Sequence, residues 1–291
     1  MTYDVIVVGG SFAGLAAATQ IARARRKVLV VDAGRRRNRF AKASHGFLTQ
    51  DGRPPAEIVA DAREQLMNYP TVELTGGTAV QAARQDEVFA VTLSDGTVHR
   101  SRRLVLATGV TDILPDIPGL AQRWGQSVFH CPYCHGYELG MGRIGVLAVS
   151  ELSMHQALLV AEWGKTTLLT NATFEPDSEQ RDQLAKRGVQ LVEERIEEIS
   201  GHADVGLQDG RVLSFDGLFT ASRTAMASPL AEQLGCEFAE GPLGSYIQTE
   251  MFMKTSVPGV FACGDAARGA GSVSIAVGDG AMAGVGAHQS L

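Results

Sequence analysis

The chain has 291 residues, of which 45% are hydrophobic and 20% are charged, with a net charge of −6. This balance is typical of a globular protein, and because no basic stretch is interleaved with aromatic residues, nucleic acid is not expected as a partner. Four cysteines are too few for a disulfide scaffold in a chain of this length. No signal-peptide pattern and no apolar run near the roughly 20 residues of a membrane span are present, which predicts a reducing, cytoplasmic setting without a membrane partner.

A strand, a glycine-rich turn, a helix and a second strand open the chain. The strands are expected at residues 4–8 and 27–31, the helix runs to about Arg25, and the second strand ends at Asp32. This order is typical of a dinucleotide-binding unit, in which the helix N-terminus faces a pyrophosphate and the acid binds ribose hydroxyls. Serine replaces the usual middle glycine, and a turn that serves packing alone is the alternative. The turn consists of Gly9, Gly10, Ser11, Phe12, Ala13 and Gly14.

The same pattern recurs 139 positions later, aligned without a gap. The matching strand, helix and strand are residues 143–147, 154–163 and 165–169. The nucleotide-binding residues are not repeated, because Gly9 aligns with Ala148 and Asp32 aligns with Asn171. No arginine or lysine follows the second strand to hold a 2′-phosphate. We therefore expect the second unit to have kept the fold and lost a conventional NADPH site, with an unusual mode of nucleotide binding as the alternative.

The remaining segments predict how the two units are connected. A β-rich stretch covers residues 72–106, and the last helix is expected at residues 274–289. The pattern favours an α/β fold with two Rossmann-like, three-layer ββα domains, one inserted into the other. The first, cofactor-binding domain would comprise residues 1–114 and 238–291, and the inserted NAD(P)-binding-like domain would comprise residues 115–237.

Two cysteines, Cys131 and Cys134, are separated by two residues and followed by His135. Such a pair can close and reopen a disulfide, and a histidine with an ordinary pKa of about 6.5 can move the accompanying protons. A structural pair, or a zinc site completed by His130 and His135, is the alternative. No second Cys-x-x-Cys motif supports it, so no metal is expected. The other two cysteines are expected to be small buried residues.

Four motifs in this order resemble the low-molecular-weight thioredoxin reductase family of flavoproteins over nearly the whole chain. They are the glycine turn, Ala107-Thr108-Gly109, the Cys-x-x-Cys pair and Phe261-Ala262-Cys263-Gly264-Asp265. The resemblance implies FAD in the first domain, a redox-active disulfide against the flavin, and a homodimer. The turn and the resemblance together predict this set of cofactor-binding residues: Gly9, Gly10, Ser11, Phe12, Ala13, Gly14, Asp32, Ala33, Arg37, His45, Val80, Thr108, Gly109, Asp265 and Val273.

Two departures from the reductase pattern indicate a sub-branch. Family reductases carry an acid directly after the second cysteine, where this chain has His135, and they carry an NADPH-binding glycine unit that this chain lacks. Residues 131–138 instead resemble the FAD-dependent dithiol oxidases that close disulfides in gliotoxin-like and holomycin-like natural products.

The resemblance to that branch implies oxidation of a small-molecule dithiol, with oxygen as the electron acceptor. By position in the family, Cys131 exchanges with the substrate, Cys134 lies on the flavin side, and His135 serves as acid and base. Two alternatives remain. One is a reductase of thioredoxin-like proteins, driven by ferredoxin or by NADPH bound in an unusual way. The other is a flavin-bound redox sensor without turnover.

Overall fold

The structure is a computed structural model in which residues 2–291 are described. It divides into two compact units, which are taken separately. Unit 1 consists of Met1–Arg39, Phe47–Thr111 and Thr224–Leu291, and unit 2 consists of Phe40–Gly46 and Asp112–Arg223. The return to the first unit thus lies at residue 224, earlier in the chain than the position near 238 expected from the sequence. Among the described residues, no helix is long and apolar enough to cross a membrane.

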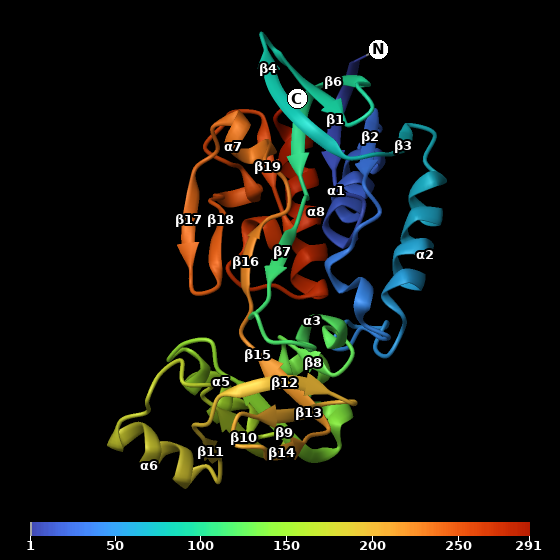
Figure 1. Ribbon diagram of the computed structural model, residues 1–291. Helices are drawn as coiled ribbons and strands as arrows, with labels where there is room; N and C mark the ends of the chain where they lie inside the picture. The colour runs from blue at the N-terminus through green and yellow to red at the C-terminus, as the bar shows by residue number, and fades with distance from the viewer. Residues whose placement is uncertain (1) are drawn as a thin grey trace. The chain divides into compact units, whose positions relative to one another are not determined.

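Unit 1 is built on a seven-stranded sheet of order β3-β2-β1-β6-β5-β4, with β19 also paired to β6 (Figure 1). The pairs β3–β2, β2–β1, β1–β6 and β6–β19 run parallel. The pairs β6–β5 and β5–β4 run antiparallel. One edge of β6 is shared, because its first part pairs with β5 and its last part pairs with β19. The strands of this sheet are β1 (Thr2–Val8), β2 (Val28–Asp32), β3 (Val72–Gly76), β4 (Ala79–Gln85), β5 (Val88–Leu93), β6 (Val98–Leu106) and β19 (Val260–Ala262). Two further strands, β17 (Phe238–Gly241) and β18 (Gly244–Ile247), pair antiparallel in a separate sheet.

The first two strands read as nearly continuous apolar runs, because a parallel strand in the middle of a sheet is covered on both faces. Helices α1 and α8 run side by side and pack on this parallel part of the sheet, and α2 packs beside β3 (Figure 1). The helical segments of unit 1 are α1 (Phe12–Arg23), η1 (Arg37–Phe40, whose last residue enters unit 2), α2 (Pro55–Met67), α7 (Leu230–Leu234), η3 (Met251–Met253), η4 (Gly264–Ala267) and α8 (Val273–Gln289).

Unit 2 repeats the plan with a parallel sheet of order β11-β10-β9-β15-β8 and a separate antiparallel sheet of order β12-β13-β14. Apolar side chains of the two sheets form one core cluster, and α5 and α6 contribute to a second. The elements are α3 (Leu120–Arg123), β8 (Val128–Phe129), α4 (Pro132–His135), η2 (Tyr137–Leu139), β9 (Met141–Leu147), α5 (Ser153–Val160), β10 (Gly164–Leu169), α6 (Ser178–Lys186), β11 (Gln190–Val192), β12 (Ile196–Ser200), β13 (Asp204–Leu207), β14 (Val212–Ser214) and β15 (Gly217–Thr220). The predicted α/β fold is confirmed.

The chain passes between the units along two short strands, β7 (Val110–Ile113) and β16 (Arg223–Met226), which pair with each other in a two-stranded sheet. These crossings interrupt unit 1 between residues 111 and 224.

Close backbone contact between α1 and α8 depends on two glycines. A Cβ at Gly280 would overlap the carbonyl oxygen of Ala13, and one at Gly284 would overlap that of Ala17. By contrast, a Cβ at Gly278, on the same helix, would meet no atom within 4 Å. The contact therefore requires glycine at 280 and 284 but not at 278.

We expect Gly280→Ala to destabilise the protein by about 1–3 kcal/mol, because the added carbon forces α8 away from a backbone oxygen. The matched control, Gly278→Ala, should be neutral or stabilising by up to about 1 kcal/mol, because alanine is the better helix former. Melting temperatures of the two variants test this. An unchanged melting temperature for Gly280→Ala would contradict the close packing of α1 on α8.

Candidate active site

The predicted glycine turn joins β1 to α1 in unit 1. Gly9 has a φ of +110°, and a side chain there would overlap the carbonyl oxygen of Ala107. A side chain at Gly14 would overlap the carbonyl oxygen of Gly9. The Gly9 amide donates to the carbonyl of Val31 (2.8 Å), which ties the turn to the end of β2. Glycine is thus required at both ends of the turn.

Helix α1 begins directly after this turn and leaves its first amides to other partners. Its N-cap residue, Ser11, makes no side-chain capping hydrogen bond. A helix N-terminus with free N–H groups carries a partial positive charge and binds anions well. The predicted residues Phe12 and Ala13 lie in this first turn. The glycine cradle and the uncapped helix start therefore fit a pyrophosphate.

The C-terminal motif folds back onto the same turn. A Cβ at Gly264, which has a φ of +68°, would lie 2.9 Å from the Cβ of Ala13. The next residue, Asp265, accepts from Arg37 in an ion pair of 2.9 Å between Oδ2 and Nη1. Two predicted cofactor residues from opposite ends of the chain are thus joined directly. Asp32 also lies at the turn, where its Oδ1 accepts from the amide of Gly10 at 3.2 Å.

The other predicted cofactor residues of unit 1 lie on neighbouring elements. Thr108 and Gly109 follow the carboxyl end of β6, Ala33 follows β2, and Val273 is the first residue of α8. Val80 lies where the register between β4 and β5 shifts. An extra residue in such a bulge is left out of the strand ladder, so its amide is available to another acceptor.

The two predicted redox cysteines are joined in unit 2. Cys131 and Cys134 form a disulfide with their Cα atoms 5.3 Å apart, and both are partly exposed. Cys131 is the N-cap residue of the short helix α4, and Pro132 is its first residue, which is the preferred place for proline in a helix. The side-chain amide of Gln156 donates to the carbonyl of His130 (3.0 Å), and this bond fixes the residue that precedes Cys131.

His135 stacks on Phe129 with a centroid distance of 4.3 Å and an interplanar angle of 20°. Burial, with a smaller contribution from His45, lowers the pKa of His135 to about 4. The expectation of an ordinary histidine pKa is therefore wrong for the disulfide form, in which the imidazole is neutral at pH 7. A thiolate released from the disulfide would favour the protonated imidazole, because an opposite charge nearby raises a histidine pKa.

His45 was predicted to lie beside the cofactor. The structure groups it with unit 2, where its Nδ1 lies 3.4 Å from the Oε1 of Glu138. Its predicted role toward the cofactor stays a prediction. Glu138, four residues after Cys134, was not singled out as a site residue from the sequence, although it ends the string of residues 131–138 that carries the resemblance.

Two exposed aromatic residues lie close to the disulfide in the chain and were also not predicted. Tyr133 is 71% exposed, and its ring meets Trp163 edge-on at 5.2 Å. Tyr137, in the following turn, is also exposed. Exposed aromatic rings beside a reactive disulfide offer an apolar surface to a substrate.

The turn of the second repeat, in unit 2, keeps the backbone plan of the first turn but is held by a different side chain. The Ala148 amide donates to the carbonyl of Leu169 (2.9 Å), so the backbone plan is kept. However, the Val149 amide donates to the hydroxyl of Ser153 (3.0 Å), which lies where the first repeat has Gly14. The matching amide of the first turn, that of Gly10, donates to Asp32 instead, so the two turns are held by different partners.

The register of the second repeat also corrects one expected equivalence. Val8 pairs with Val31 in the first repeat, whereas Leu147 pairs with Leu169 in the second, so the connection is one residue shorter. The residue equivalent to Asp32 is consequently Thr170, and the predicted equivalence with Asn171 is wrong. Neither residue supplies a carboxylate to a ribose.

The remaining two cysteines, Cys236 and Cys263, are unpaired and buried, as expected. Burial raises the pKa of both thiols, which disfavours the reactive thiolate. Within residues 2–291, no group of three or more histidine, cysteine or acidic residues is arranged to hold a metal ion.

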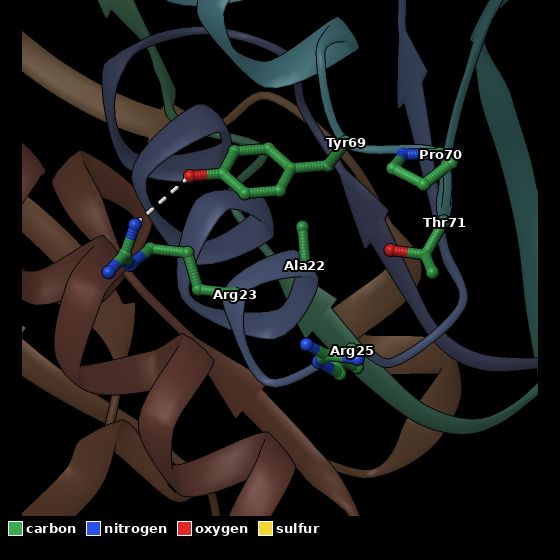
Figure 2. Close-up of a pocket in the computed structure, with 6 residues that line it drawn as sticks. All are labelled: Ala22, Arg23, Arg25, Tyr69, Pro70 and Thr71. Carbon is green, nitrogen blue, oxygen red and sulfur yellow. Dashed lines mark hydrogen bonds between the residues drawn. The ribbon is translucent and has the colours of Figure 1, made fainter.

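A surface hollow of about 570 Å³ opens elsewhere on unit 1 (Figure 2). It lies at the C-terminal end of α1, opposite the glycine turn, and Arg23 donates to the hydroxyl of Tyr69 across it (3.2 Å). Its residues are Ala22, Arg23, Arg25, Tyr69, Pro70 and Thr71. It therefore contributes to neither site described above.

Comparison with known proteins identifies the family. The sequence profile described as pyridine nucleotide-disulphide oxidoreductase matches residues 3–280. The chain belongs to this family. Its members include FAD-dependent enzymes of the thioredoxin reductase type, and the resemblance predicted from the motifs is confirmed.

Individual relatives agree with this assignment. The chain is 35% identical to thioredoxin reductase tcpT of Claviceps purpurea (90% of this chain and 86% of that protein). It is 32% identical to thioredoxin reductase sirT of Leptosphaeria maculans (98% and 93%). A solved oxidoreductase from Agrobacterium tumefaciens is 53% identical with a TM-score of 0.97 (100% and 98%), and HlmI is 34% identical with a TM-score of 0.93 (99% and 92%).

This thioredoxin reductase-like protein is thus an FAD-dependent oxidoreductase that acts on dithiols and disulfides. The glycine cradle, the uncapped start of α1 and the Arg37–Asp265 pair fit the cofactor that the family implies. When bound, FAD supplies the two-electron chemistry that complements the disulfide.

The low pKa of His135 makes stability depend on pH. The unfolded chain takes up a proton on this residue as the pH falls through about 6.5, whereas the folded oxidised protein does so only near pH 4. The stability associated with His135 is therefore present in full above pH 6.5 and is lost towards pH 4, by at most about 3 kcal/mol.

We expect His135→Gln to flatten the fall in melting temperature of the oxidised protein between pH 6.5 and 5. His155→Gln removes an exposed histidine of the same unit and serves as the control, which should keep the wild-type slope. Equal slopes for wild type and His135→Gln would contradict the buried neutral imidazole.

Proposed function

We propose that this protein oxidises a small-molecule dithiol to a disulfide through Cys131, Cys134 and FAD, with oxygen as the final electron acceptor. The observation that carries the proposal is the end of β10, where no arginine or lysine follows to hold the 2′-phosphate of NADPH, and where Thr170 stands in place of the acid that would bind the ribose of NADH. A conventional nicotinamide-nucleotide site needs one of these groups. Electrons are then supplied by the dithiol itself.

The proposed reaction begins at the disulfide. A substrate thiolate attacks the sulfur of Cys131, the Cys131–Cys134 bond breaks, and Cys134 leaves as a thiolate. The second substrate thiol, after losing its proton, attacks the substrate sulfur of this mixed disulfide. Cys131 then leaves, and the substrate departs as a disulfide. Two electrons now reside on the protein dithiol, and bound FAD would supply the two-electron chemistry that returns the protein to its disulfide form, with oxygen as the acceptor.

The proposed part of His135 is to hold a proton during this exchange. Its imidazole is neutral while the disulfide is intact, so it can accept a proton when a thiol becomes a thiolate. The exposed rings of Tyr133 and Tyr137 favour an apolar substrate over a polar one.

A second candidate function is reduction of a thioredoxin-like protein, driven by NADPH bound in an unusual way or by ferredoxin. The names of the curated relatives, which are thioredoxin reductases, favour it. A flavin-bound redox sensor without turnover is a third candidate. On the resemblance alone we also propose a homodimer and a cytoplasmic location, which size-exclusion chromatography and cell fractionation can test.

Anaerobic flavin reduction separates these candidates. The purified yellow protein is mixed with micromolar NADPH or with dithiothreitol, and flavin absorbance is followed over time. We expect bleaching by the dithiol and none by NADPH, followed by recovery of the colour and formation of hydrogen peroxide on admission of air. Rapid bleaching by NADPH would overturn the oxidase proposal, and bleaching by neither donor would favour the sensor.

Single cysteine variants test the proposed roles of the two thiols. Cys134→Ser should be trapped as a stable mixed disulfide with oxidised glutathione, because the proposed substrate-exchanging thiol of Cys131 remains and nothing resolves the adduct. Cys131→Ser should form this adduct far more slowly. Intact-protein mass spectrometry measures both, and the buried Cys236 and Cys263 provide an internal background. Preferential trapping in Cys131→Ser would reverse the assignment.

A further inference from the structure

A cation from α2 lies over the glycine turn of unit 1. The Nη2 of Arg63 donates to the carboxylate Oδ2 of Asp32 and to the carbonyl oxygen of Gly10, the latter at 3.1 Å. The amide of Gly10 donates in turn to the other oxygen of Asp32 at 3.2 Å. Arg63, Asp32 and Gly10 thus form a closed set of hydrogen bonds.

The absence of a side chain at Gly10 permits this arrangement. A Cβ there would lie 2.7 Å from the Cβ of Asp32 and 2.8 Å from its Cγ. The Asp32 side chain is 12% exposed, so its charge needs a partner, and the guanidinium provides one. Arg63 therefore pairs with the carboxylate and fixes it at the edge of the turn.

The guanidinium is not saturated by these bonds. Both use a single nitrogen, Nη2, and no partner for Nη1 is present among residues 2–291, while the side chain keeps 34% exposure. A guanidinium has five N–H donors, and its charge lies beside the turn where a pyrophosphate would bind. The adenosine end of FAD brings both ribose hydroxyls and negative charge to such a turn.

We infer that Arg63 is a positioning residue for the adenosine end of FAD, acting through Asp32 and by its charge. It orients the Asp32 carboxylate for the ribose and offsets the charge of the pyrophosphate. The inference rests on the FAD binding of the family and is independent of the direction of electron flow. The sequence did not reveal it, because Arg63 lies on a different element from the turn and from Asp32.

The test compares affinities of the apoprotein for FAD, ADP and FMN. Arg63→Met should weaken FAD binding and ADP competition by roughly 10- to 100-fold each, the range for a lost hydrogen bond to a charged group. FMN, which lacks the adenosine end, should bind within about 2-fold of wild type, a selectivity that general damage to the fold would not produce. Arg63→Lys should recover part of the loss, because it keeps the charge without the planar fork.

Arg53→Met is the matched control. Arg53 lies just before α2 and pairs with Asp61 (2.9 Å) and Glu57 (3.7 Å) of that helix. Neither pair involves the glycine turn, so loss of Arg53 should leave the affinities for FAD, ADP and FMN unchanged. If Arg63→Met does not fold, Arg63→Lys alone must still lower FAD and ADP affinity relative to FMN. Unchanged or tighter FAD binding, or an equal loss for FMN, overturns the inference.

A double-mutant cycle with Asp32→Asn tests the proposed route through Asp32. The effects of Arg63→Met and Asp32→Asn on FAD affinity should be markedly less than additive, because either change breaks the same set of bonds. Strictly additive effects overturn the route through Asp32.

Discussion

The backbones of α1 and α8 approach each other closely because Gly280 and Gly284 present no side chain to the carbonyl oxygens of α1. The N-terminal end of α8 is thereby held next to the start of α1. The motif between β19 and α8 is brought with it, so that Gly264 packs on Ala13 and Asp265 meets Arg37. A site assembled from both ends of the chain therefore depends on the absence of a few side chains between two helices.

A different constraint governs the disulfide in unit 2. The short helix α4 sets Cys131 and Cys134 within bonding distance, and Phe129 covers one face of the following histidine. Burial keeps that imidazole uncharged while no thiolate is present, whereas reduction would create the charge that stabilises its protonated form. Proton affinity is thus coupled to the redox state of the neighbouring cysteines, which suits a reaction in which protons and electrons move together.

Much of this arrangement could be predicted from the sequence because it depends on local patterns. The glycine turn, the acid that ends β2 and the Cys-x-x-Cys pair each lie within one short segment, and the repeat follows from strand and helix periodicity. Register across the second repeat could not be predicted in this way. An alignment without gaps does not detect that the link from β9 to β10 is one residue shorter than the link from β1 to β2. It therefore matches Asp32 with Asn171, whereas the strand register matches Asp32 with Thr170.

Contacts between side chains far apart in the chain could likewise not be predicted from the sequence. Arg63 reaches Asp32 from α2, and Trp163 reaches Tyr133 from the segment after α5, and neither pair has a spacing that signals contact. The pKa of His135 also depends on tertiary burial rather than on its neighbours in the chain. In each case the missing information was the packing of one element on another.

The proposed direction of electron flow follows from the free energy of nucleotide binding. NADPH at the second turn would find no arginine or lysine after β10 for its 2′-phosphate. The loss of such a charged contact amounts to about 1.5–3 kcal/mol, which is roughly a 10- to 100-fold loss of affinity. A dithiol that attacks Cys131 meets no such cost, because it delivers its electrons to an exposed disulfide without a nucleotide site. The same difference predicts that Ser153→Gly together with Thr170→Asp would raise the affinity for NADH, whose free ribose hydroxyl a carboxylate binds, and not for NADPH, whose 2′-phosphate a carboxylate repels.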